Sequence, residues 1–224
     1  MKKEKTLSIL IKIIAIAVSV YGLYRSFGKS DYFTYFTNLS NIAIDLVLAV
    51  SLILVIANKK PAKAWYIIKY LFTISIMLTF LIYLAVLAPT DKDGFINAYI
   101  RNYCGSLCVH FIGPVLAILD FIIFDKNFKS KKRYALYAII PPLIYVGYVV
   151  ILAQCFGFRW GDNMMAPYNF INYGAPCGWF GFDLGNINST TLGIGTFYMI
   201  IILCAIFILL GILLLWLNKR AHKK

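Results

Sequence analysis

Residues 200–217, IIILCAIFILLGILLLWL, decide the fold class of this chain. The run carries no charged side chain, and apolar and polar residues do not alternate along it. This pattern excludes a half-buried strand. A hydrocarbon core of about 30 Å needs about 20 apolar residues in a helix. Five earlier stretches have the same character, and we predict an all-α, polytopic membrane protein with a single domain over residues 1–224. The six predicted transmembrane helices cover residues 7–27, 36–57, 65–88, 107–124, 134–154 and 195–217.

The composition excludes a soluble globular or disordered chain. Hydrophobic residues make up 61% of the 224 residues and charged residues only 14%, whereas soluble domains contain about 45–50% and about 25%. Glu4 is the only glutamate in the chain. Most of the protein surface is therefore expected to face lipid.

The basic residues predict the orientation in the membrane. The net charge of +13 would suggest nucleic acid as a partner in a soluble protein, but here Lys and Arg flank the apolar stretches. Fifteen of the 22 lie at the N-terminus, in 58–64, in 125–133 and in the C-terminal tail, against five in the other loops. The positive-inside rule then places both termini in the cytoplasm of a multi-pass protein of the cell membrane. We expect membrane lipid as a partner and no nucleic acid.

The predicted external loop 155–194 is long and rich in Gly, Asn and aromatic residues. It has two interpretations of equal weight, a lid on the mouth of the helix bundle or a loop lying among lipid headgroups. The four cysteines predicted outside the membrane allow one or two disulfides. We expect Cys155 and Cys177 to pair with each other, or with Cys104 or Cys108 if the loop folds over the bundle.

Ionisable side chains inside the predicted helices are expensive in lipid and are candidates for a site. Lys12 and Lys69 lie about one turn from the cytoplasmic ends, where long side chains can extend to the interface and act as topology anchors. For Asp120 we favour a structural ion pair with the basic stretch 126–133. Asp45 and His110 have no such simple explanation.

A polar stripe runs along the predicted second helix at steps of three and four residues, which places its members on one face. Its residues are Thr34, Thr37, Asn38, Asn41 and Asp45, while Ser40 lies off the stripe. In lipid this face must point into the bundle. It either forms hydrogen bonds between helices or lines a site.

Thr37 and His110 are predicted at a similar depth, because the second and fourth helices run in the same direction. A hydroxyl needs a nearby base to act as a nucleophile, and histidine can take its proton near neutral pH. Asn38 or Asn41 could then donate hydrogen bonds to an oxyanion. The alternative is a structural, hydrogen-bonded histidine.

We expect no cofactor and no metal. His110 with Cys104 and Cys108 supplies at most three ligands and has no acidic partner nearby, which is a poor zinc site. No phosphate-binding loop, nucleophile elbow or dinucleotide fingerprint occurs in the chain.

Four motifs carry a family resemblance: YFTNLSN at 35–41, HFIGPVLAILDFIIF at 110–124, PPLIYVGYVV at 141–150 and APYNFINYG at 166–174. At these residues the chain resembles a bacterial branch of the androgen-induced six-transmembrane family, whose animal members hydrolyse fatty-acid esters of hydroxy fatty acids. The resemblance implies a catalytic pair at Thr37 and His110. In the animal branch the residue three positions after the threonine is often acidic, and it is Ser40 here.

The sequence thus predicts a threonine/histidine hydrolase that acts on a lipid ester near the outer leaflet, with Asn38, Asn41 and Asp45 near the substrate. Thr34, one turn from Thr37, is an alternative nucleophile. The alternative hypothesis is a non-enzymatic function. The chain would then be a lipid or small-molecule binding protein, or a transporter, whose polar stripe lines a cavity.

Overall fold

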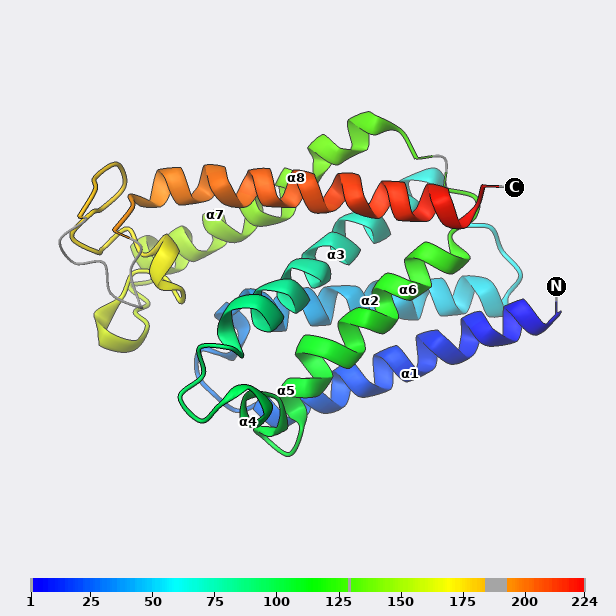
Figure 1. Ribbon diagram of the computed structural model, residues 1–224, viewed down its shortest axis with the longest axis horizontal. Helices are drawn as coiled ribbons and strands as arrows, with labels where there is room; N and C mark the ends of the chain where they lie inside the picture. Colours follow the sequence, from blue (N-terminus) through cyan, green and yellow to red (C-terminus); the bar gives the residue numbers. More distant parts are fainter. Residues whose placement is uncertain (1, 129, 184–192, 224) are drawn as a thin grey trace. The chain divides into compact units, whose positions relative to one another are not determined.

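Six long apolar helices are present in the computed structural model (Figure 1), which describes residues 2–128, 130–183 and 193–223. All six are long and apolar enough to cross a membrane. The predicted number and order of the helices and the all-α fold class are therefore confirmed. The principal helices are α1 (Lys2–Ser26), α2 (Phe36–Ile56), α3 (Lys63–Ile82), α6 (Gly113–Phe124), α7 (Ile140–Cys155) and α8 (Thr196–Ala221).

The fourth span is less regular than predicted. It begins with the short helix α5 (Gly105–Leu107), widens into the π-helical turn η3 (Cys108–Ile112) and continues as α6. Pro114 lies at the start of α6 and has no N–H to donate to the preceding turn. The wider turn bonds Gly113 N–H to the Cys108 carbonyl, so the chain accommodates the proline by a local change of helix type.

The chain divides into two compact units. Unit 1 comprises residues 1–137 and 210–224, and unit 2 comprises residues 138–209. In unit 1, α1 packs against α2 and α6, and α3 packs against the same two helices. The four helices therefore form a closed bundle. Its central apolar cluster is fully buried and consists of Ala15, Ile44, Val47, Leu48, Ile76 and Ala117.

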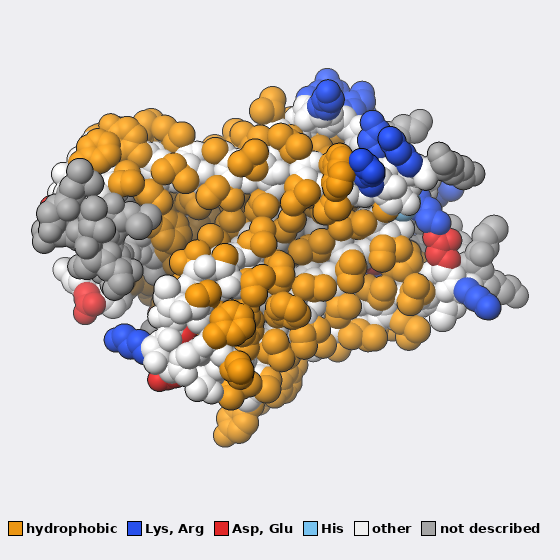
Figure 2. Space-filling model, in the orientation of Figure 1, with side chains coloured by type: hydrophobic (Ala, Val, Ile, Leu, Met, Phe, Trp, Pro, Cys, Tyr) orange, Lys and Arg blue, Asp and Glu red, His pale blue; other side chains and the backbone are white. Residues whose placement is uncertain are grey.

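Both chain termini lie at one end of unit 1, called here the terminal end. The Lys5 ammonium donates to Asn58 Oδ1 at 2.7 Å just after α2, and Glu4 forms an ion pair with Lys126 just after α6. On α8, the Asn218 amide donates to the Phe121 carbonyl at 3.1 Å and so satisfies a carbonyl near the end of α6. Lys and Arg side chains gather at this end (Figure 2).

At the opposite end of unit 1, the connection between α3 and α5 contains a helix that we did not predict, α4 (Phe95–Ile100). Arg101 pairs with Asp91 at 2.8 Å and with Asp93 at 2.7 Å and holds the connection together. The Asp93 backbone N–H and the Arg101 guanidinium lower the pKa of the Asp91 carboxyl below its usual value. The Tyr83 hydroxyl donates to the Ala98 carbonyl at 2.6 Å and anchors α4 to the bundle.

Unit 2 contains α7, the described parts of the 155–194 loop and the first half of α8; residues 184–192 lie outside the described residues. The loop has local structure: Tyr173 stacks on Trp179 with ring centroids 4.8 Å apart, and Gln154 donates to the Tyr173 hydroxyl at 3.1 Å. Trp160 is buried. These contacts show a folded segment, while the choice between a lid and a headgroup loop stays a prediction.

The disulfide prediction is wrong in this structure. All five cysteines of the chain are free thiols, including the four predicted outside the membrane. The Cys177 thiol instead donates to the Ile194 carbonyl at 3.6 Å. A weak sulfur hydrogen bond within the folded loop thus replaces the expected covalent link.

Close helix packing in unit 1 depends on Gly22 of α1. A Cβ atom at this position would lie 2.7 Å from Val109 Cγ1 and 2.8 Å from the Gly105 carbonyl oxygen. We expect Gly22→Ala to destabilise the protein by about 1–3 kcal/mol through overpacking. The measurement is a thermal melt of the purified protein in detergent.

Gly147→Ala is the matched control, because a Cβ atom on Gly147 meets nothing within 4 Å. It should leave the melting temperature unchanged or slightly raised, since alanine favours a helix over glycine. Equal melting temperatures for the two variants would show that α1 does not need the close approach at Gly22.

Candidate functional site

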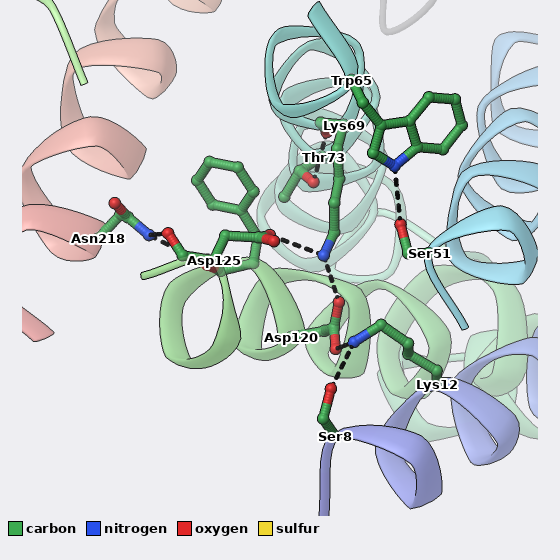
Figure 3. A network of polar contacts seen from close by, with 10 residues as sticks. Ser8, Lys12, Ser51, Trp65, Lys69, Thr73, Asp120, Asp125 and Asn218 are labelled. Atoms are coloured by element: carbon green, nitrogen blue, oxygen red, sulfur yellow. Dashed lines mark hydrogen bonds and ion pairs between the residues drawn. The ribbon is translucent and has the colours of Figure 1, made fainter. Parts of the chain in front are cut away.

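Unit 1 contains a buried network of four charges near its terminal end (Figure 3). One carboxylate oxygen of Asp120 on α6 accepts a hydrogen bond from the Lys12 ammonium of α1 at 2.5 Å. The other oxygen accepts one from the Lys69 ammonium of α3 at 2.6 Å. Lys69 also pairs with Asp125 at 2.6 Å. The two ammonium groups and the two carboxylates thus alternate along a series of ion pairs, and the four charges sum to zero.

The network corrects two sequence predictions. Lys12 and Lys69 do not extend to the interface as topology anchors, because only 2% and 1% of their surfaces are exposed. Asp120 does form an ion pair, but its partners are these two lysines and not the basic stretch 126–133. Each ammonium finds a carboxylate inside the bundle, which removes the need to reach water.

Neutral groups complete the network. The Lys12 ammonium donates to the Ser8 hydroxyl at 2.8 Å, one turn away on α1. Next to Lys69, the Trp65 indole N–H donates to Ser51 on α2 at 3.1 Å (Figure 3). The charge network connects α1, α3 and α6, and the Trp65–Ser51 hydrogen bond beside it joins α3 to α2, as expected for a structural centre of the bundle.

A second polar layer lies toward the opposite end of unit 1 and is organised by Asn41 on α2. The Asn41 amide nitrogen donates to the Thr37 carbonyl at 2.8 Å and to the Val109 carbonyl at 3.1 Å. Its amide oxygen accepts the Ser19 hydroxyl of α1 at 3.2 Å. One side chain therefore joins the turn that carries Thr37 to the residue just before His110.

His110 lies in the π-helical turn η3 and stacks on Tyr83, with ring centroids 3.7 Å apart and planes inclined by 11°. Because the Tyr83 hydroxyl is bonded to the Ala98 carbonyl, the ring beneath His110 is fixed in place. His110 Nδ1 is buried and has no hydrogen-bond partner in the described part of the chain. No described group therefore commits this nitrogen to the role of donor or acceptor.

Thr34 is not on the face of α2, contrary to the predicted stripe. It lies in a separate 3₁₀ turn, Tyr32–Thr34, and its hydroxyl donates to the Asp31 carbonyl at 2.6 Å. Thr37, in the first turn of α2, is half-buried, and its hydroxyl bonds to no residue that the structure describes. No direct hydrogen bond joins Thr37 to His110 among the described contacts.

The remaining stripe residues have different surroundings. Asn38 donates to the Tyr32 carbonyl at 2.8 Å. Ser40, which we placed off the stripe, is buried and shares a hydrogen bond of 3.0 Å with Thr79 on α3. Both carboxylate oxygens of Asp45 are buried without a hydrogen-bond partner in the described chain, although the Ser19 hydroxyl lies close by.

The two polar layers are separated by the central apolar cluster. Ala15 lies between Lys12 and Ser19 on α1, and Ala117 lies between His110 and Asp120 on the fourth span. Leu48 on α2 is likewise buried between the layers. On α2, Asp45 lies between Ile44 and Val47 and is buried at the level of the cluster, so the apolar separation is complete on α1 and on the fourth span but not on α2.

Sequence reasoning missed Ser19, Thr79 and Tyr83 as parts of the second layer. A signal for Ser19 was present in α1, where small and polar residues recur at steps of three and four. These residues are Ser8, Lys12, Ala15, Ser19 and Gly22, and all of them are buried. For Tyr83 the sequence carried no comparable signal, because tyrosine is common at helix ends near an interface.

No group of three or more His, Cys, Asp or Glu side chains suited to a metal ion occurs in the part of the chain that the structure describes. Comparisons with models of protein families, with curated proteins and with solved structures gave no match. The family resemblance therefore rests on the sequence motifs alone and stays a prediction.

Proposed function

We propose that this integral membrane protein is a threonine/histidine hydrolase of a lipid ester, with Thr37 as the nucleophile and His110 as its base. The observation that carries the proposal is the double hydrogen bond of the Asn41 amide to the carbonyls of Thr37 and Val109. This bond holds the two candidate residues on adjacent turns. The unpaired Nδ1 of His110 and the unbonded hydroxyl of Thr37 supply the chemical groups.

In the proposed reaction, Thr37 Oγ attacks the acyl carbonyl while His110 takes the hydroxyl proton, directly or through a water. His110 then gives the proton to the departing alkoxide, and a water molecule releases the acyl group from Thr37. Asn38 has a second amide hydrogen for the oxyanion, whereas both amide hydrogens of Asn41 are already used. Asn41 is therefore a positioning residue in this proposal.

The choice of Thr37 over Thr34 follows from their hydrogen bonds. The Thr34 hydroxyl is committed to the Asp31 carbonyl, which would have to be released before attack. Thr37 has no such bond. A slot for the acyl chain between the helices remains a prediction.

We further propose that residues 1–224 act as one bundle in the cell membrane. Both termini would be cytoplasmic, and the second polar layer would lie near the outer leaflet. Single cysteines test the orientation in a variant without native cysteines. Cysteine at Lys92 should react with an impermeant maleimide in intact cells, and cysteine at Lys132 only after permeabilisation. Both positions are exposed in the structure. The reverse pattern would contradict the orientation and the assignment to the outer leaflet.

A non-enzymatic binding protein or transporter is the second candidate, and the unpaired carboxylate of Asp45 favours it. A buried carboxylate without a partner is suited to a cation or a polar ligand. Against transport stands the apolar packing of α1 and of the fourth span, where Ala15 and Ala117 separate the two polar layers. A hydrolase needs polar groups at one depth only, whereas a conduction path needs them throughout.

The decisive experiment is labelling of the purified protein with a fluorophosphonate probe, followed by mass-spectrometric mapping of the labelled residue. We expect a phosphonylated Thr37, since the probe traps an activated hydroxyl. Label on Thr34 would place the nucleophile one turn away. If no residue of the second polar layer is labelled, the hydrolase proposal fails and the binding or transport candidate replaces it.

A further inference from the structure

A basic pocket opens at the terminal end of unit 1, away from the second polar layer, where the proposed hydrolase site lies. Its volume is about 550 Å³, which is within the range of about 300–1,000 Å³ for small-molecule sites. It is formed by the connection between α2 and α3, by the first turn of α3 and by the chain that follows α6. The lining residues are Lys60, Pro61, Lys63, Tyr66, Lys126, Asn127, Phe128, Lys131 and Tyr134.

The charge of the pocket is positive. Four lysines and no acidic residue are among the described residues that line it. Lys126 is paired with Glu4, but Lys60, Lys63 and Lys131 have no acidic partner among the described residues. Nearby Asp125 is buried and paired with Lys69, so it does not neutralise the pocket. Three lysines that converge on one cavity without counter-ions create a site for an anion.

Three stacked aromatic side chains form part of the pocket wall. The Phe128 ring lies between Tyr66 and Tyr134, with centroid distances of 6.1 Å and 5.8 Å and inclinations of 25° and 20°. Tyr134 is only 2% exposed, and its hydroxyl has no hydrogen-bond partner within the described chain. Tyr134 therefore contributes its ring to the pocket wall, while protein covers its hydroxyl oxygen.

We propose that this pocket binds a phosphate group, carried by an anionic lipid headgroup or by a soluble phosphate ester. Lysine binds phosphate as a point charge and can approach it from several sides, so three lysines suit its tetrahedral oxygens. Basic pockets between transmembrane helices at the membrane boundary commonly hold anionic headgroups, and the same groups serve a soluble ester equally well.

The test is calorimetric titration of the full-length protein in a non-ionic detergent. The probes are dioctanoyl phosphatidic acid, glycerol phosphate and inorganic phosphate. We expect Lys60→Gln with Lys131→Gln to weaken binding at least tenfold, because two of the unpaired charges are lost. Tyr134→Phe keeps the ring stack and removes only a hydroxyl that protein covers, so it should change the affinity less than twofold.

The matched control is Lys3→Gln with Lys223→Gln, which removes the same charge from exposed positions at the terminal end, outside the pocket lining. It should change affinity less than twofold. Binding of phosphatidic acid alone would identify a lipid source, and equal binding of glycerol phosphate a soluble one. Absence of binding by all three probes, or equal weakening in the control, would overturn the proposal. Thermal melts of each variant separate lost binding from lost folding.

Discussion

Asp120→Asn is expected to cost about 3–5 kcal/mol of stability, because it leaves buried lysines without a full counter-charge. The Asp120 carboxylate binds both Lys12 and Lys69, and none of its own surface is exposed. After the substitution Lys69 keeps Asp125, but Lys12 keeps only the Ser8 hydroxyl and the Phe124 ring at 5.3 Å. Detergent-solubilised protein should show a large fall in melting temperature and in monodisperse yield.

A second substitution makes this prediction specific. Lys12→Met in the Asp120→Asn background removes the stranded ammonium and should recover much of the lost stability, since Lys69 and Asp125 still form a neutral pair. Glu4→Gln is the control: it breaks the exposed pair with Lys126 and should cost at most about 1 kcal/mol. A melting temperature of Asp120→Asn equal to that of Glu4→Gln would show that the buried network contributes little.

The second large effect concerns the proposed catalytic pair. Thr37→Ala and His110→Phe should each lower ester hydrolysis by at least about a hundredfold, because a nucleophile or its base is removed. Phenylalanine is preferred at position 110 because it preserves a ring against Tyr83. The double variant should be no worse than either single variant, since the two residues act as a unit. Initial rates with a short-chain lipid ester measure this.

Thr34→Ala is the control for this series and should retain most of the activity. Its hydroxyl serves a backbone carbonyl in a 3₁₀ turn, so the substitution tests folding near the site without touching the proposed chemistry. Loss of activity in Thr34→Ala alone would move the nucleophile one turn. Full activity in all three single variants would leave no role for the pair.

The number and order of the helices could be predicted because they depend on local composition. A run such as 200–217 has no soluble alternative, and the predicted span 36–57 differs from Phe36–Ile56 by one residue. The π-helical turn before Pro114 was not predicted, because a proline at this position is compatible with a kink, a break or a change of helix type. Hydropathy does not distinguish these outcomes.

The partners of the buried charges could not be predicted, because they are set by the rotation of each helix about its axis. Near a helix end, the ammonium groups of Lys12 and Lys69 can be stabilised in two ways, by extension to the interface or by pairing inside the bundle. The buried stripe of α1, from Ser8 to Gly22, carries the information that favours the second solution. Its steps of three and four residues place Lys12 on the packed face, so this stripe was the usable signal.

The four-charge network also has a consequence for the order in which the bundle is made. During synthesis α1 and α3 enter the membrane before α6 exists, and each carries a lysine whose carboxylate partners come more than fifty residues after Lys69. Until α6 is inserted, these lysines have no counter-charge at their own level in the bundle. We therefore expect the first three helices to pack loosely until α6 supplies Asp120.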